Sequence, residues 1–69
     1  MGDHSQTITD VTVVLFGKDG SAFSILGQVA HAMREAGIDR AVINQYLDEA
    51  QSGDYNHLLA TTMKYVHVV

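Results

Sequence analysis

Hydrophobic and polar residues follow one another in a pattern that predicts two strands with helices between them. β-branched and hydrophobic residues dominate residues 7–16 and predict a strand, with Thr9, Val11 and Val13 on one face. The C-terminal half of this segment is hydrophobic on both sides, so we expect both faces to be covered there. Residues 64–69 have a similar composition and predict a second strand.

Three stretches with helical spacing of hydrophobic residues lie between these strands. The first helix is expected to begin after Ser21 and to end at Gly37, while Asp39 and Asp54 are expected to cap two further helices. The hydrophobic residues that define the helices are Ala22, Ile25, Leu26, Val29, Met33 and Ala36 in the first, Val42, Ile43, Tyr46, Leu47 and Ala50 in the second, and Tyr55, Leu58, Leu59 and Met63 in the third.

The element order is therefore β-α-α-α-β, an α+β fold over residues 7–69 that follows a flexible, polar segment over residues 1–6. If consecutive helices run antiparallel, the two strands pair in parallel. A two-stranded sheet leaves both edges open, and 69 residues without cysteine form only a small core. We therefore expect a second copy to extend the sheet, in a homo-oligomer that is a dimer or larger.

The charge of the chain disfavours several classes of partner. Four basic residues are scattered among eight acidic ones, for a net charge of −4. Duplex nucleic acid is disfavoured because phosphate neutralisation needs clustered Lys and Arg. No hydrophobic run approaches the ~20 residues of a membrane span, and the polar, acidic start of the chain differs from a signal peptide. We expect a cytoplasmic protein, and the missing cysteines fit a reducing compartment.

No cofactor, metal or catalytic motif is evident in the sequence. The four histidines show neither His-x-x-x-His nor His-x-His spacing. Ser24, Gln28, His31 and Glu35 form a polar stripe on the first helix, which we interpret as a solvated face, although His31 and Glu35 could pair as acid and base. We expect neither a cofactor nor enzymatic activity.

Gly27 lies in the middle of the first predicted helix, where glycine costs roughly 1 kcal/mol relative to alanine. A glycine at such a position is typical of a close approach by another backbone. We expect a second helix, from this chain or another copy, to approach it, with a bound planar ligand as the alternative.

A glycine-rich turn between the first strand and the first helix is the first candidate binding site. A helix start of this kind offers unpaired N–H groups and the positive end of the helix dipole to an anion such as phosphate. The spacing differs from a P-loop and from G-x-G-x-x-G, so a plain strand-to-helix turn is the alternative. The candidate residues are Gly17, Lys18, Asp19, Gly20, Ser21 and Phe23.

The start of the third helix is the second candidate site. Tyr55, Asn56 and His57 place an aromatic ring and hydrogen-bonding groups directly after a glycine. Such groups can stack on and hydrogen-bond a planar ligand such as a base. The alternative is purely structural, with Asp54 capping the helix and Tyr55 packing in the core.

These two stretches, residues 17–27 and 52–62, together resemble a family of short, mostly uncharacterised bacterial and phage proteins. Those relatives commonly carry Asn at the position of Ser21, and the similarity extends over most of residues 9–69. The resemblance implies that the glycine-rich turn and the third helix start act together. Small phage proteins often act as anti-defence factors that bind a host protein or sequester a nucleotide signal. This function is suggested only by analogy with that class of proteins.

Two hypotheses for function follow. The first is a homo-oligomeric binding protein, such as an anti-defence factor, that sequesters a nucleotide-like anionic ligand at the two helix starts. The second is an acidic inhibitor that blocks a basic surface of a host protein. Its acidic surface would consist of Asp39, Asp48, Glu49 and Asp54.

Overall fold

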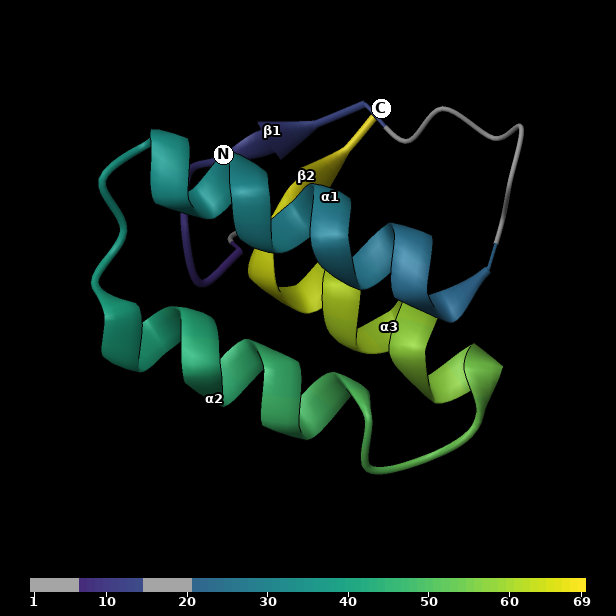
Figure 1. Cartoon of the computed structure of the whole chain (residues 1–69). Coiled ribbons are helices and arrows are strands. Elements are labelled where there is room, and N and C mark those ends of the chain that lie inside the picture. Colours follow the sequence, from purple (N-terminus) through teal and green to yellow (C-terminus); the bar gives the residue numbers. More distant parts are fainter. Residues whose placement is uncertain (1–6, 15–20) are drawn as a thin grey trace.

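The computed structural model describes residues 7–14 and 21–69 and has the predicted element order and fold class (Figure 1). The elements are β1 (Thr12–Val13), α1 (Ala22–Glu35), α2 (Arg40–Ala50), α3 (Tyr55–Tyr65) and β2 (His67–Val68). The predicted flexible segment over residues 1–6 and the turn over residues 17–20 lie outside the described residues.

The two strands pair in parallel, the arrangement expected if consecutive helices run antiparallel, with Thr12 beside His67 and Val13 beside Val68. The strand β1 is much shorter than the predicted segment 7–16, of which residues 15 and 16 are not described. Thr9 explains part of this difference, because its Oγ1 donates to the carbonyl oxygen of Tyr65 at 2.8 Å and accepts from the N–H of Val11 at 3.2 Å. The side chain of Thr9 thus occupies groups that a regular ladder would use.

The prediction that the second strand begins at residue 64 is wrong, because α3 continues through Tyr65. The helical conformation buries the Tyr65 side chain completely and places its ring 5.3 Å from the ring of Tyr46. Burial of a large aromatic side chain outweighs the weaker β-propensity of the residue. Only His67 and Val68 remain for β2.

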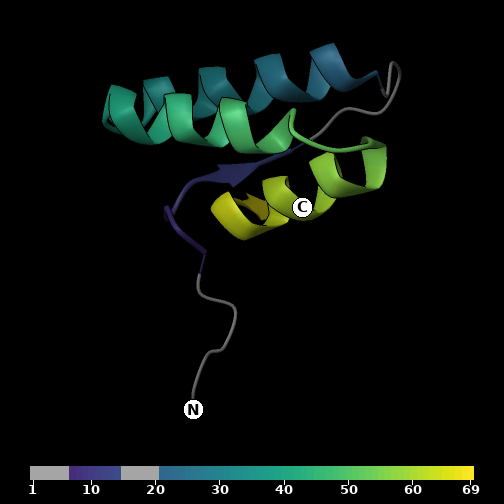
Figure 2. The same cartoon turned by 90° about the horizontal axis from the view of Figure 1, so that it is seen from below.

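The helices lie on one face of the sheet. Figure 2 shows α1 and α2 side by side, and α1 also contacts β1 while α3 contacts β2. Val13 of β1 and the preceding Val11, which the alternation places on one face, are both buried. The opposite face carries Val14, whose side chain is 48% exposed, so the prediction that both faces are covered is wrong at this residue.

A hydrogen-bonded pair at the α2–α3 interface completes the core. Tyr46 Oη and Thr62 Oγ1 lie 2.7 Å apart in a fully buried environment. Because Thr62 Oγ1 donates its proton to the Leu58 carbonyl at 2.9 Å, the Tyr46 hydroxyl is the donor in this pair. Burial raises the pKa of the Tyr46 hydroxyl.

The helix boundaries follow local rules. The side chains of Ser21, Asp39 and Asp54 each accept a hydrogen bond from a first-turn amide of the following helix, as the sequence predicts. Gly37 has a φ of +80°, which glycine adopts without strain, and the amide of Ile38 returns to the carbonyl of Met33 at 3.0 Å. These contacts separate α1 from α2 by a tight turn.

None of the described residues of this chain approaches the backbone of Gly27 closely, because a Cβ built there would meet no described atom within 4 Å. The expected helix is therefore not one of this chain's described helices, and approach by another copy or by a ligand stays a prediction. The polar stripe of α1 is a solvated face, as interpreted, with His31 and Glu35 exposed and Gln28 Nε2 donating to Ser24 Oγ at 3.1 Å. Within the described residues, none of the helices combines the length and the hydrophobicity that crossing a membrane requires.

Two alanine substitutions test this account of the glycines. Gly27→Ala should stabilise the protein by about 1 kcal/mol, because alanine favours the helix interior and meets open space there. Gly37→Ala should destabilise it by about 1 kcal/mol, because the new Cβ is strained at positive φ. Urea denaturation of both variants measures these changes, and a loss of stability in Gly27→Ala would show that another surface covers this position.

Candidate functional site

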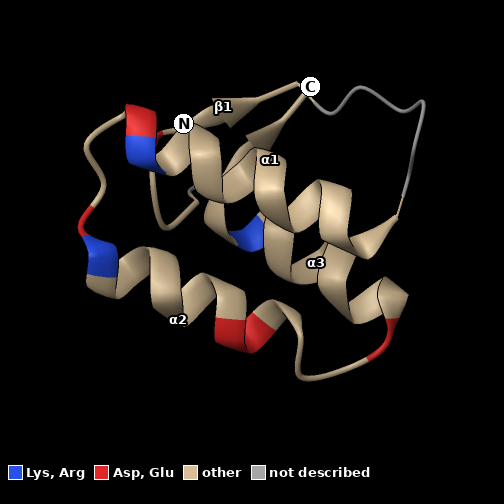
Figure 3. Ribbon diagram, viewed as in Figure 1, with Lys and Arg blue, Asp and Glu red and all other residues tan. Residues whose placement is uncertain are grey.

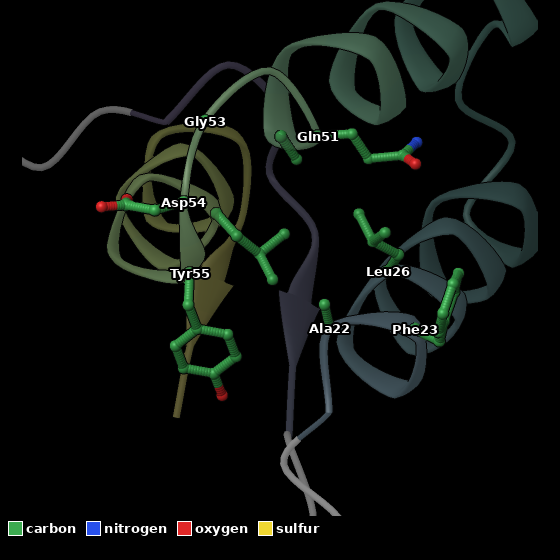
Figure 4. Close-up of a pocket in the computed structure, with 9 residues that line it drawn as sticks. Ala22, Phe23, Leu26, Gln51, Gly53, Asp54 and Tyr55 are labelled. Carbon is green, nitrogen blue, oxygen red and sulfur yellow. The ribbon is translucent and has the colours of Figure 1, made fainter.

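A pocket of about 270 Å³ lies between the first turn of α1 and the connection from α2 to α3. Figure 4 shows its lining, which comes from three helices and the turn that precedes α3. Leu26, Ala50 and Leu58 are buried and form its floor. The exposed residues at its rim are Ala22, Phe23, Gln51, Gly53, Asp54 and Tyr55.

Two aromatic side chains at this rim belong to the two predicted site stretches. Phe23 is 84% exposed and Tyr55 is 45% exposed, and they lie on opposite sides of the pocket in Figure 4. The alternative that Tyr55 packs in the core is therefore wrong. The fold thus brings one residue of the glycine-rich stretch and one residue of the α3 start to the same pocket, 32 positions apart in the sequence.

The other predicted residues at the α3 start do not line the pocket. Asn56 is exposed on α3, and the ring of His57 is turned towards the end of α2. His57 Nε2 lies 2.9 Å from the carbonyl oxygen of Glu49 and 3.1 Å from Ser52 Oγ. His57 thus holds the connection between α2 and α3 in place, and residues of this connection line one wall of the pocket.

The connection between α2 and α3 needs a glycine at position 53, because the ring of His57 lies close to its backbone. A Cβ at position 53 would lie 2.8 Å from Cγ of His57, a distance that real Cβ atoms do not show. The ring of His57 therefore needs the space that the absent side chain leaves. The sequence pattern Ser-Gly-Asp-Tyr-Asn-His, which first suggested a ligand site, serves in part to close this turn.

Capping side chains occupy some of the helix-start amides that were predicted to hold an anion. Ser21 Oγ accepts from the N–H of Ser24 at 3.2 Å, and Asp54 Oδ1 accepts from the N–H of His57 at 2.9 Å. In Figure 4 the carboxylate of Asp54 points away from the pocket. Gly17, Lys18, Asp19 and Gly20 lie outside the described residues.

The pocket lining offers shape and hydrophobic surface more than polar contacts. Gln51 Nε2 donates to the carbonyl oxygen of Leu47 at 2.9 Å, which leaves the amide oxygen of Gln51 as an acceptor at the rim. None of the described lining residues is basic, and none is a histidine. Among the described residues, no group of three or more His, Cys, Asp or Glu side chains is placed to hold a metal ion.

The four acidic residues of the second hypothesis serve largely within the fold. Asp39 and Asp54 cap helices, while the carboxylate of Glu49 forms an ion pair with Lys64 and accepts from Tyr65 Oη at 3.1 Å. The hydrogen bond from Lys64 is the main cause that lowers the pKa of Glu49. Asp48 is exposed beside Glu49 on the last turns of α2, where Figure 3 shows adjacent acidic positions.

The sequence did not point to the floor of the pocket. Leu26, Ala50 and Leu58 were predicted only as core residues, and Gln51 was not predicted as a site residue. These four residues share one property: each lies near the end of a helix that contributes to the pocket. This property becomes visible only once the packing of the helices is known.

Comparison with protein-family models, with curated proteins and with solved structures gave no match to this chain. The family resemblance inferred from the two motif stretches therefore stays a prediction.

Gly53→Ala should destabilise the protein by about 1 to 3 kcal/mol, because the new methyl group would collide with His57. In a His57→Ala background the same substitution should cost much less, since the colliding ring is gone. Urea denaturation of the two single variants and the double variant measures this coupling. Equal costs of Gly53→Ala in both backgrounds would contradict the steric explanation.

The Glu49–Lys64 pair should make stability depend on pH in the acidic range. The pKa of Glu49 is lowered in the folded protein, so its stabilising contribution is present above the ordinary carboxyl pKa and is lost as pH falls through the lowered value. Glu49→Gln should therefore lower the melting temperature at neutral pH, and this effect should shrink as the pH falls through the lowered pKa of Glu49. Asp48→Asn, at an exposed neighbour, is the matched control. A Glu49→Gln effect that persists unchanged in acid would contradict this role.

Proposed function

We propose that this protein is a small binding protein that captures a planar, weakly polar group, of the kind found in a nucleobase, in the pocket between α1 and α3. The observation that carries the proposal is that Phe23 and Tyr55 flank one pocket while remaining exposed. Aromatic rings that keep part of their surface exposed at the rim of a pocket can stack on a planar ligand. Sequestration of a nucleotide-like ligand is the activity we infer from such a pocket.

The size of the pocket supports a small occupant. Ligand pockets commonly enclose about 300 to 1,000 Å³, and the volume here, about 270 Å³, lies just below that range. The floor of Leu26, Ala50 and Leu58 offers a hydrophobic surface without a charge. A single ring system with one donor for the Gln51 amide oxygen suits these dimensions better than a large ligand does.

The proposal concerns the planar part of the ligand. The sequence also predicted an anionic part, held by the residues around Lys18, and these residues lie outside the described part of the chain. The described lining contains no cation that could neutralise a phosphate. Comparing the affinity for a nucleoside with that for the matching nucleotide should therefore separate the contribution of the pocket from that of the residues around Lys18.

The acidic inhibitor remains the alternative hypothesis, with less support from the geometry. Three of its four carboxylates, those of Asp39, Glu49 and Asp54, form hydrogen bonds or ion pairs within the chain. A surface that mimics nucleic acid would need its carboxylates directed towards the partner. Assembly into a homo-oligomer through the open sheet stays a prediction that accompanies either hypothesis.

Titration of the isotope-labelled protein with adenosine, guanosine and their monophosphates, followed by NMR, tests the proposal. We expect saturable shifts at Phe23, Leu26, Tyr55 and Leu58. Phe23→Ala and Tyr55→Ala should each weaken binding by about tenfold, the usual cost of losing one stacking partner. Met63→Ala is the matched control, because Met63 is 61% exposed on α3 and does not line the pocket.

Absence of shifts at millimolar nucleoside and nucleotide would overturn the proposal. Shifts that Met63→Ala weakens as much as Phe23→Ala does would overturn it as well, because they would indicate general adhesion to exposed hydrophobic groups. Binding of the monophosphates alone would place the main recognition outside this pocket.

A further inference from the structure

A second cavity, of about 200 Å³, lies where α1 ends and α2 begins. Figure 3 shows two basic positions near this corner, at the opposite end of α2 from the aromatic pocket. They are Arg34, in the last turn of α1, and Arg40, the first residue of α2. The other residues that line the cavity are Ile38, Ile43, Asn44 and Leu47.

Among the described basic residues, these two arginines are the ones whose side chains form no ion pair with a described residue. Lys64, the other basic residue among the described positions, is paired with Glu49. No hydrogen bond or ion pair joins the side chain of Arg34 or of Arg40 to any described residue, although Glu35 and Asp39 are their neighbours in the sequence. The carboxylate of Asp39 instead accepts from the N–H of Ala41 at 3.3 Å, so it is occupied at the helix start.

The chemistry of the lining suits an oxyanion. A guanidinium group presents N–H donors in a planar fork that matches a carboxylate or a phosphate. Asn44 follows Arg40 by one helical turn and lines the same cavity, so its side-chain amide offers a further donor. Ile43 is buried and Ile38 and Leu47 are half-buried, so these three side chains give the cavity a hydrophobic floor beneath the exposed arginines.

We propose that the Arg34–Arg40 cavity binds the phosphate or carboxylate group of a small molecule. This inference goes beyond the proposed function and is independent of it, because the two cavities share no lining residue. The anion that the sequence placed at the glycine-rich turn thus has a candidate site built from described residues at the other end of α2. The net charge of −4 repels anions at long range, so binding here is short-range and sensitive to salt.

Titration with inorganic phosphate, methyl phosphate and acetate at low ionic strength tests the inference, with NMR detection of the backbone and of the arginine side-chain N–H groups. We expect saturable shifts at Arg34, Arg40 and Asn44, with none at Phe23 or Tyr55. The phosphate and acetate arms show which oxyanion the cavity prefers. Raising the salt concentration should weaken each interaction.

Arg34→Gln and Arg40→Gln should each weaken phosphate binding by about tenfold, because each removes one charge-assisted donor pair. Arg40→Lys, which keeps the charge and loses the fork, should restore only part of the affinity. Lys64→Gln is the matched control, since it removes the same charge away from the cavity and should change binding less than about threefold.

Two outcomes overturn the inference. The first is the absence of saturable shifts at Arg34 and Arg40 with any of the three probes at millimolar concentration. The second is an equal loss in Lys64→Gln and in the two arginine variants, which would show a response to net charge alone. Because both arginines are exposed and make no contact that holds the fold, the melting temperatures of their variants should match that of the parent protein.

Discussion

The contact between Tyr46 and Tyr65 determines how the rest of the chain is arranged. Both rings are fully buried, and the Tyr46 hydroxyl also donates to Thr62, so α2 and α3 are held together by aromatic packing and a buried hydrogen bond. Since Tyr65 is the last residue of α3, its position also sets where β2 begins beside β1. The opposite end of the same helix pair forms the wall of the aromatic pocket.

Much of the fold could be predicted from the sequence because the signals are local. Ser21, Asp39 and Asp54 cap the helices within three residues, and Gly37 ends α1 through its own backbone conformation. The end of α3 could not be predicted in this way. Tyr65 is helical because its ring is buried against Tyr46, and the sequence between them does not reveal that contact.

The candidate site also combines features that the sequence suggested with features that only the packing of the helices reveals. The resemblance implied that two stretches act together, which stays a prediction, and the fold brings Phe23 of one and Tyr55 of the other to one pocket. The sequence also named His57, whose position three residues into the helix directs the ring back to Glu49 and Gly53. In the sequence, Arg34 and Arg40 were interpreted only as scattered basic residues. The short turn between α1 and α2 brings these two residues to one corner of the fold.

Glu49 contacts two parts of α3 at once, and this has a consequence for motion. Its carbonyl oxygen lies at hydrogen-bond distance from His57 near the start of α3, while its carboxylate binds Lys64 and Tyr65 at the end. Sliding of α3 along α2 by one turn would break both attachments together, so shear between these helices is suppressed. A wall of the aromatic pocket is consequently fixed before a ligand arrives, and little of the binding free energy is spent on ordering it.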